Sequence, residues 1–100
     1  MLPYYVKRFR VARGSRSFTA KWTRRSASVQ KKFSGYQIRY SLKSNMSGAK
    51  YVKASKKSSY KKVSKLKKKR RYYVQVRTYT IKNKVTYYSK WSTKKSVVTR

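Results

Sequence analysis

The side chains that could do chemistry in this chain are almost all cationic. The sequence has 31 lysines and arginines and no aspartate, glutamate, histidine or cysteine, which gives a formal net charge of +31. Without carboxylate or imidazole there is no ordinary general acid or base, and without a thiol there is no thiolate nucleophile. The side chains that usually bind zinc, calcium and magnesium are missing as well. We therefore expect no enzyme, no cofactor and no metal site.

The densest group of cations lies in the second half of the chain. It comprises Lys65, Lys67, Lys68, Lys69, Arg70 and Arg71. Neighbouring ammonium and guanidinium groups repel one another, and without a nearby carboxylate only counterions or a polyanion can relieve that repulsion. These six residues are the candidate polyanion-binding site. The plainer interpretation is a solvated loop.

Aromatic rings alternate with cations in the segments that follow. Tyr73, Arg77 and Tyr79 are separated by four and two positions in one segment, and Trp91 lies in the next segment. If both segments are neighbouring strands, the four side chains form one strip on one face. We expect this strip to be structural. The alternative is a stacking surface, since exposed rings among cations also bind single-stranded nucleic acid.

An alternation of apolar and polar residues predicts the elements that position these groups. The alternation is clear in residues 18–22, 36–40 and 72–79, and weaker in 6–11, 49–53, 60–63 and 86–91, with 97–98 closing the series. Turn-like segments separate them at 13–15, 34–35, 44–48, 56–59 and 82–84. No segment shows helical periodicity with start and stop signals. About seven short strands at regular spacing predict an all-β antiparallel sandwich.

The length predicts one domain, residues 1–100, with a core from about 6 to 98. High charge alone would indicate disorder, but 11 tyrosines, 3 phenylalanines and 2 tryptophans are too many aromatics for that. Residues 1–8 have no apolar stretch of the signal-peptide kind and are expected to open a strand. No segment reaches the ~18 apolar residues of a membrane span.

Four groups of residues resemble the landmarks of a fibronectin type III domain. They are Phe18-x-Ala20-x-Trp22, Gly35-Tyr36-x-Ile38-x-Tyr40, Leu66 followed by Tyr72-x-Val74-x-Val76-x-Thr78, and Tyr88-Ser89-x-Trp91-Ser92. The resemblance extends from about 6 to 98, and the abundance of lysine and tyrosine is similar to that of bacterial extracellular proteins. It implies a seven-stranded, immunoglobulin-like Greek key with strands A, B and E packed against C, C′, F and G.

The resemblance also implies roles for individual residues. Trp22 would be the core tryptophan of strand B, and Tyr72 with Leu66 would form the tyrosine corner, whose hydroxyl bonds to upstream backbone. Residues 88–92 resemble half of the tryptophan-serine box of cytokine-receptor domains, which implies that Arg77 stacks on Trp91. The expected structural core is Phe18, Trp22, Tyr36, Ile38, Leu66, Tyr72, Val74 and Val76.

The sequence departs from the family pattern at three points. Thr78 stands where a small apolar residue is common, residues 67–71 replace the usual Pro-Gly type of E–F turn, and acidic residues are missing altogether. An Arg-Gly-Asp integrin motif is excluded because the chain has no aspartate.

The function that follows is a non-enzymatic binding or spacer module of a secreted or cell-surface protein, in the manner of adhesion domains. Its expected partners are anionic wall polymer or acidic polysaccharide, bound through generic affinity for polyanions, and neighbouring domains of a longer protein. Two alternatives stay open. One is a basic nucleic-acid-binding protein, and the other is a supercharged or designed scaffold without a native function.

Overall fold

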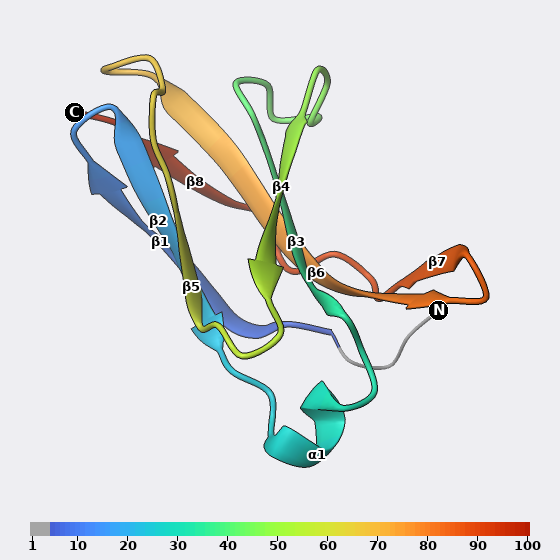
Figure 1. The fold of residues 1–100 in the computed structure, drawn as a ribbon. Helices are drawn as coiled ribbons and strands as arrows, with labels where there is room; N and C mark the ends of the chain where they lie inside the picture. The colour runs from blue at the N-terminus through green and yellow to red at the C-terminus, as the bar shows by residue number, and fades with distance from the viewer. Residues whose placement is uncertain (1–4) are drawn as a thin grey trace.

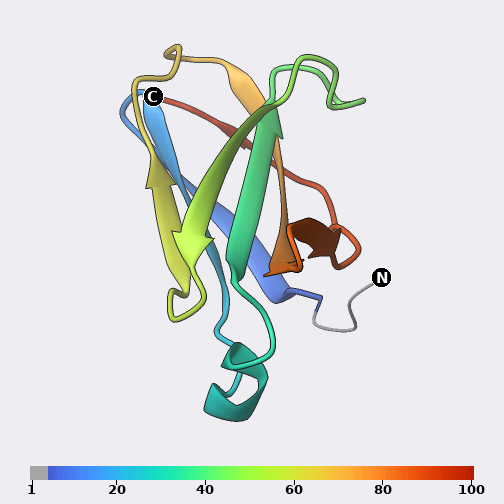
Figure 2. The same ribbon diagram turned by 45° about the vertical axis from the view of Figure 1, so that its right-hand side comes forward.

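The chain folds into two antiparallel β-sheets that face one another as a sandwich (Figures 1 and 2). The structure is a computed structural model that describes residues 5–100. The strand predicted at 6–11 is therefore described, whereas residues 1–4 of the segment 1–8, where no signal peptide was expected, lie outside the described residues. One sheet has the order β1-β2-β5, with β1 at Lys7–Gly14, β2 at Ser17–Thr23 and β5 at Tyr60–Val63. The all-β sandwich predicted from the alternation is confirmed.

The second sheet has the order β4-β3-β6-β7, and β8 pairs with β6 as well. Its strands are β3 (Gly35–Ser41), β4 (Lys50–Ser55), β6 (Arg71–Lys82), β7 (Val85–Tyr88) and β8 (Lys95–Val98). The strands implied as A, B and E thus form one sheet, and those implied as C, C′, F and G form the other.

The seventh expected strand is divided in two, so residues 5–100 hold eight strand segments instead of seven. β7 pairs with the end of β6, from Tyr79↔Tyr88 to Lys82↔Val85, whereas β8 pairs with its beginning, from Arg71↔Val98 to Val74↔Lys95. The residues between them leave the regular ladder. A single helical turn, α1 (Ala27–Gln30), was also not predicted, because four residues are too few to show a helical period.

The core lies between the two sheets. All eight residues expected there are buried, none more than 8% exposed, and Val6, Phe9, Ala20, Phe33, Val63 and Val97 complete the cluster. Trp22 packs against Tyr36 with 4.9 Å between ring centroids. Its indole N–H donates to the Ser58 carbonyl at 3.0 Å, so the one polar atom of this buried ring has a partner.

The backbone explains why a glycine stands at residue 35 and how the β6–β7 turn is formed. Gly35 was expected in a turn, but it is a buried residue of β3, where a Cβ would come within 2.8 Å of the Ala54 carbonyl oxygen. It is needed for close approach of β4. At the β6–β7 turn, Asn83 (φ 51°) and Lys84 (φ 63°) are both left-handed, as a tight two-residue hairpin requires.

Candidate functional site

The six predicted cations lie at one end of the sandwich, beside the β1–β2 turn and the C-terminal residues (Figure 1). All six are exposed. Arg16, on the β1–β2 turn, joins Lys67, Lys68, Lys69 and Arg70 around a shallow hollow in the surface. We call Arg16 and the six predicted residues the cationic end. No aspartate or glutamate exists in the chain to pair with them.

Residues 67–70 are held by hydrogen bonds from two directions. The Tyr72 hydroxyl accepts the Lys67 N–H at 3.0 Å, as the tyrosine corner implies. Thr99, which is buried, donates its hydroxyl to the Lys67 carbonyl, and its own carbonyl accepts the Lys69 N–H at 3.1 Å. The Thr99 N–H in turn donates to the Arg70 carbonyl at 3.0 Å. The backbone of this cationic segment is therefore fixed while its side chains stay in solvent.

Residues 65–71 include two lysines in a strained backbone conformation. Lys65 (φ 61°) and Lys69 (φ 54°) are left-handed, a region that costs a non-glycine residue roughly 1–2 kcal/mol. Lysine thus stands where a glycine would be free of strain. The hydrogen bond from Lys69 to Thr99 holds the turn in this conformation and keeps the charges adjacent.

Arg16 was not predicted to belong to this group. Its backbone carbonyl accepts the Leu66 N–H at 2.9 Å and its N–H donates to the Arg100 carbonyl at 2.7 Å, which brings it to the cationic turn. The signal that could have found it is topological. In the implied sandwich, the A–B and E–F turns lie at the same end.

On the outer face of the second sheet, the Arg77 guanidinium carbon lies 4.0 Å from the centroid of the Trp91 ring. This is the stacking that the tryptophan-serine resemblance implied. Arg39 approaches the same ring at 4.2 Å, and Arg77 also lies 3.5 Å from the Tyr88 centroid. The two arginines are fixed by glutamines: Arg77 Nε donates to Gln37 Oε1 at 2.8 Å, and Arg39 Nε to Gln75 Oε1 at 3.0 Å.

Tyr73 and Tyr79, predicted for the same strip, do not contact Trp91. Tyr73 is four residues from Arg77 on β6, which is about 13 Å along a strand, and its ring lies near the Lys94 ammonium instead. Tyr79 lies 5.0 Å from the Lys53 ammonium. The stack consists of Arg39, Arg77, Tyr88 and Trp91, and the Tyr51 ring lies 6.5 Å from that of Trp91 at the edge of the stack. Arg39 was missed because strand alternation does not reveal which residue of a neighbouring strand lies opposite.

Arg77 is partly buried in this stack. Burial, together with the neighbouring Arg39 charge, lowers its pKa from the ordinary arginine value, although the Tyr88 hydroxyl opposes this effect. The Trp91 ring is in contact with two guanidinium groups. These contacts favour a structural role for the strip over a surface for stacking bases.

Comparison with known proteins agrees with the sandwich and its landmarks. The model of the fibronectin type III domain family matches residues 5–95, and the chain belongs to this family. Domains of this family are common binding or spacer modules of extracellular proteins, and are typically non-enzymatic. No curated protein matches the chain.

Solved structures show the same fold. The crystal structure of the FN1–FN3 domains of chicken CNTN1 is 24% identical, with a TM-score of 0.78 over 95% of this chain; the chain spans 31% of that fragment. A solution structure of the fn3 domain of human contactin 1 is 15% identical, with a TM-score of 0.81, covering 99% of this chain and 79% of that one. The fn3 domain of human collagen alpha-1(XX) is 18% identical, with a TM-score of 0.72 over 95% and 83%.

Two features are absent from residues 5–100. No helix there is long and apolar enough to cross a membrane. No group of three or more metal-ligating side chains occurs among these residues.

Proposed function

We propose that this fibronectin type III domain is a polyanion-binding module of a secreted or cell-surface protein, of the lysine- and tyrosine-rich kind found in bacterial extracellular proteins. The observation that carries the proposal is the cationic end. Seven exposed cations lie there on a backbone fixed by Tyr72 and Thr99, and the chain has no aspartate or glutamate side chain to neutralise them. An acidic polysaccharide or an anionic wall polymer is the partner.

Two physical effects favour binding at this end. Bringing a polyanion to adjacent cations removes their mutual repulsion and releases the counterions that both partners hold. In addition, the backbone is already ordered, so little conformational entropy is lost there on binding. Cations elsewhere on the chain would also attract a polyanion, but they are not clustered in the way that those of the cationic end are.

The test compares two variants that each lose five charges. The first replaces Lys67, Lys68, Lys69, Arg70 and Arg71 with glutamine, and the matched control replaces the exposed Lys31, Lys32, Lys57, Lys82 and Lys84. The control residues belong to the α1–β3 connection, the β4–β5 turn and the β6–β7 hairpin, and these segments lie away from the β5–β6 connection (Figure 1). Affinity for heparin is measured at 0.15 M salt after both variants are shown to be folded. We expect the first variant to lose most of the affinity and the control little. Equal losses would mean that net charge alone binds the polymer, and the site would be rejected.

Duplex DNA in the same assay tests the nucleic-acid alternative. Charge-driven binding predicts no sequence preference and a fall of log K with log salt of about 0.9 per phosphate contacted. A preference for one DNA sequence over another, retained at 0.15 M salt, would favour a nucleic-acid-binding protein instead.

A further inference from the structure

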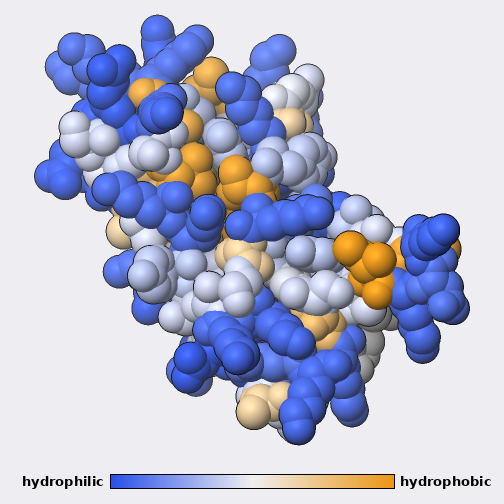
Figure 3. Space-filling view, viewed as in Figure 1, coloured by the Kyte–Doolittle hydropathy of each residue, from blue (hydrophilic) through white to orange (hydrophobic). Residues whose placement is uncertain are grey.

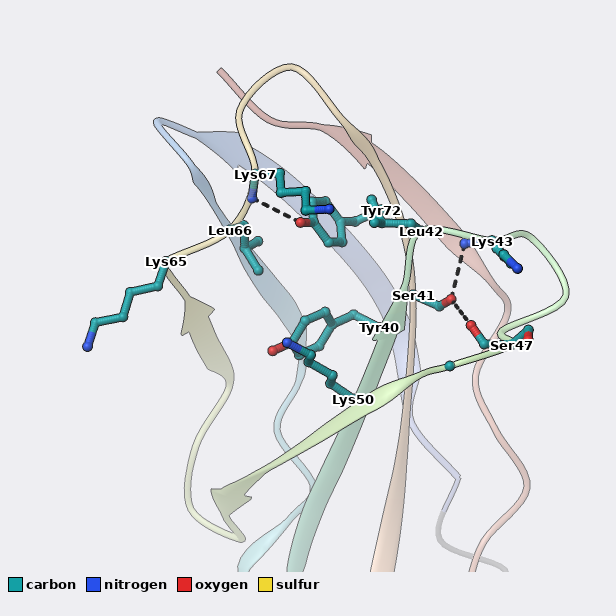
Figure 4. A pocket seen from close by; sticks show the side chains of 11 residues that line it. Tyr40, Ser41, Leu42, Lys43, Ser47, Lys50, Lys65, Leu66, Lys67 and Tyr72 are labelled. Carbon is teal, nitrogen blue, oxygen red and sulfur yellow. Dashed lines mark hydrogen bonds between the residues drawn. The ribbon is translucent and has the colours of Figure 1, made fainter.

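A pocket of about 400 Å³ lies next to the cationic end, between the β3–β4 and β5–β6 connections (Figure 4). Its volume is in the range of small-molecule sites, roughly 300–1,000 Å³. Lys67 belongs both to this pocket and to the cationic end. A polymer bound at the cationic end could therefore continue into the pocket without a gap.

The inner surface of the pocket is apolar and aromatic. Leu66 and Tyr72 are buried there, and the Tyr40 ring lies 6.1 Å from that of Tyr72 at an angle of 60°. Phe18 supports Tyr40 from the core at 5.6 Å in an edge-on contact. This surface is thus rigid and suited to the C–H face of a ring.

Cations surround this apolar surface. Lys43, Lys50, Lys65 and Lys67 all line the pocket and are exposed. Figure 4 shows the Lys50 side chain beside Tyr40 and that of Lys67 beside Tyr72, whereas Lys43 and Lys65 point outward. Lys50 and Lys67 are therefore the two cations placed to contact a ligand, and the other two add positive potential at the rim.

The rim opposite the cationic end is fixed by Ser41. Its hydroxyl donates to the Ser47 carbonyl at 2.6 Å and accepts the Lys43 N–H at 3.1 Å. Both bonds are drawn in Figure 4. The β3–β4 connection is thereby held at the mouth of the pocket instead of collapsing onto Tyr40.

One polar group in the pocket is free to bind a ligand. Within residues 5–100, no protein group forms a hydrogen bond with the Tyr40 hydroxyl, although that of Tyr72 is engaged by Lys67. Burial, and to a smaller extent Tyr72, raises the pKa of Tyr40, so its hydroxyl stays protonated near neutral pH and can donate a hydrogen bond.

We infer that this pocket is the subsite for one acidic sugar residue of the polymer, an inference that rests on the proposed function. The sugar ring lies against Tyr40 and Leu66, and its carboxylate or sulfate group contacts the Lys50 and Lys67 ammonium groups. A ring with one apolar face and an anionic substituent matches an apolar floor flanked by cations. A linear polyphosphate has the charge and lacks the ring.

The experiment uses small probes and two pairs of matched variants. Lys50→Gln and Tyr40→Phe alter the pocket. Lys57→Gln and Tyr51→Phe are their controls, since both controls are exposed residues that do not line the pocket. Heparin tetrasaccharide, hyaluronan tetrasaccharide and inorganic triphosphate are titrated calorimetrically at 0.15 M salt, and thermal melts verify that every variant is folded.

We expect Lys50→Gln to weaken binding of an acidic tetrasaccharide about tenfold and Tyr40→Phe about fivefold, the size of one charged and one neutral hydrogen bond. The controls should change it less than about twofold. Triphosphate should be affected much less by Tyr40→Phe. Hyaluronan has carboxylates and no sulfate, whereas heparin has both, so binding of heparin without hyaluronan would identify sulfate as the bound group.

Two results would overturn the inference. If the pocket variants bind both tetrasaccharides like the unaltered chain, the subsite is wrong, and the proposed function still stands provided that the turn variant loses heparin affinity. If Tyr40→Phe weakens triphosphate as much as the tetrasaccharides, the pocket does not recognise a sugar ring. Failure of the proposed function itself gives a different pattern, in which the turn variant and its five-site control lose equal heparin affinity.

Discussion

Tyr72 connects the core to the cationic surface through a single side chain. Its ring is buried, 6.4 Å from that of Phe18 and 6.1 Å from that of Tyr40. Its hydroxyl emerges at the turn and accepts the Lys67 N–H. Packing of the core therefore determines where the first of five adjacent cations lies. Removal of the Tyr72 hydroxyl alone breaks the hydrogen bond to Lys67 and leaves the buried ring in place, so that no cavity forms.

We predict that Tyr72→Phe lowers the free energy of unfolding by about 1–3 kcal/mol, because the partly buried Lys67 N–H loses its acceptor. Tyr73→Phe is the matched control. Tyr73 lies on the opposite face of β6, is partly exposed, and its hydroxyl has no hydrogen-bond partner within residues 5–100. Urea unfolding of both variants measures the difference. A larger loss for Tyr73→Phe than for Tyr72→Phe would mean that the two faces of β6 are exchanged.

At the scale of elements, the interruption between β7 and β8 is compensated by two serines. Ser92 Oγ accepts the Val76 N–H and Ser89 Oγ accepts the Thr78 N–H, both at 3.0 Å. The N–H groups of the same serines donate to the carbonyls of Val76 and Thr78. Each serine thus satisfies both backbone groups of one residue of β6 where a continuous strand is missing. The break also leaves Trp91 at the position where it meets Arg77.

We predict that Ser89→Ala and Ser92→Ala each cost about 1–3 kcal/mol of folding free energy, since each leaves a buried N–H of β6 without an acceptor. Ser96→Ala serves as the control, because the Ser96 hydroxyl accepts only an exposed bond from Arg71. Chemical unfolding of the three variants is the measurement. Losses no greater than that of Ser96→Ala would show that solvent or a backbone shift replaces the serine hydroxyls.

How much of the fold and of the site could be predicted depends on how far apart in the sequence the contacting residues lie. Alternation places Trp22, Ile38 and Val74 in the core because strand geometry repeats every two residues. The break in the last strand leaves no such mark, since Ser89 and Ser92 look like ordinary polar positions. Arg16 and Arg39 join their clusters through contacts with residues far away in the sequence. The pocket needed the same kind of information, because Tyr40 on β3 and Lys67 in the β5–β6 connection are far apart in the sequence.

For the whole molecule, the question is how a chain of charge +31 stays folded. The sandwich is compact, with a radius of gyration of 13.4 Å, close to the roughly 13 Å of an ordinary domain of this length. The Debye length is about 30 Å at 0.01 M salt and about 8 Å at 0.15 M. At low salt every cation therefore repels every other across the molecule, and at physiological salt only neighbours interact strongly.

We predict from this comparison that the melting temperature rises with ionic strength between 0.01 and 0.15 M. All charged side chains are cationic, so salt screens repulsion between them and weakens no side-chain ion pair. Each kcal/mol of repulsion removed should raise it by about 4–8 °C in a domain of this size. Sulfate or phosphate should act more strongly than chloride at equal ionic strength, by binding at the cationic end. Differential scanning calorimetry in the three salts measures this, and an unchanged melting temperature would show that self-repulsion contributes little.

The two five-charge variants locate the repulsion. Both carry a net charge of +26, which is 31 minus 5, so repulsion spread over the whole molecule is relieved almost equally in both. Glutamine at residues 67–71 removes charges that are adjacent on a fixed turn, where screening at 0.15 M is still incomplete. That variant should therefore melt at a higher temperature than the control even at 0.15 M salt. Equal melting temperatures at both ionic strengths would mean that the turn holds its adjacent charges without a local cost in stability.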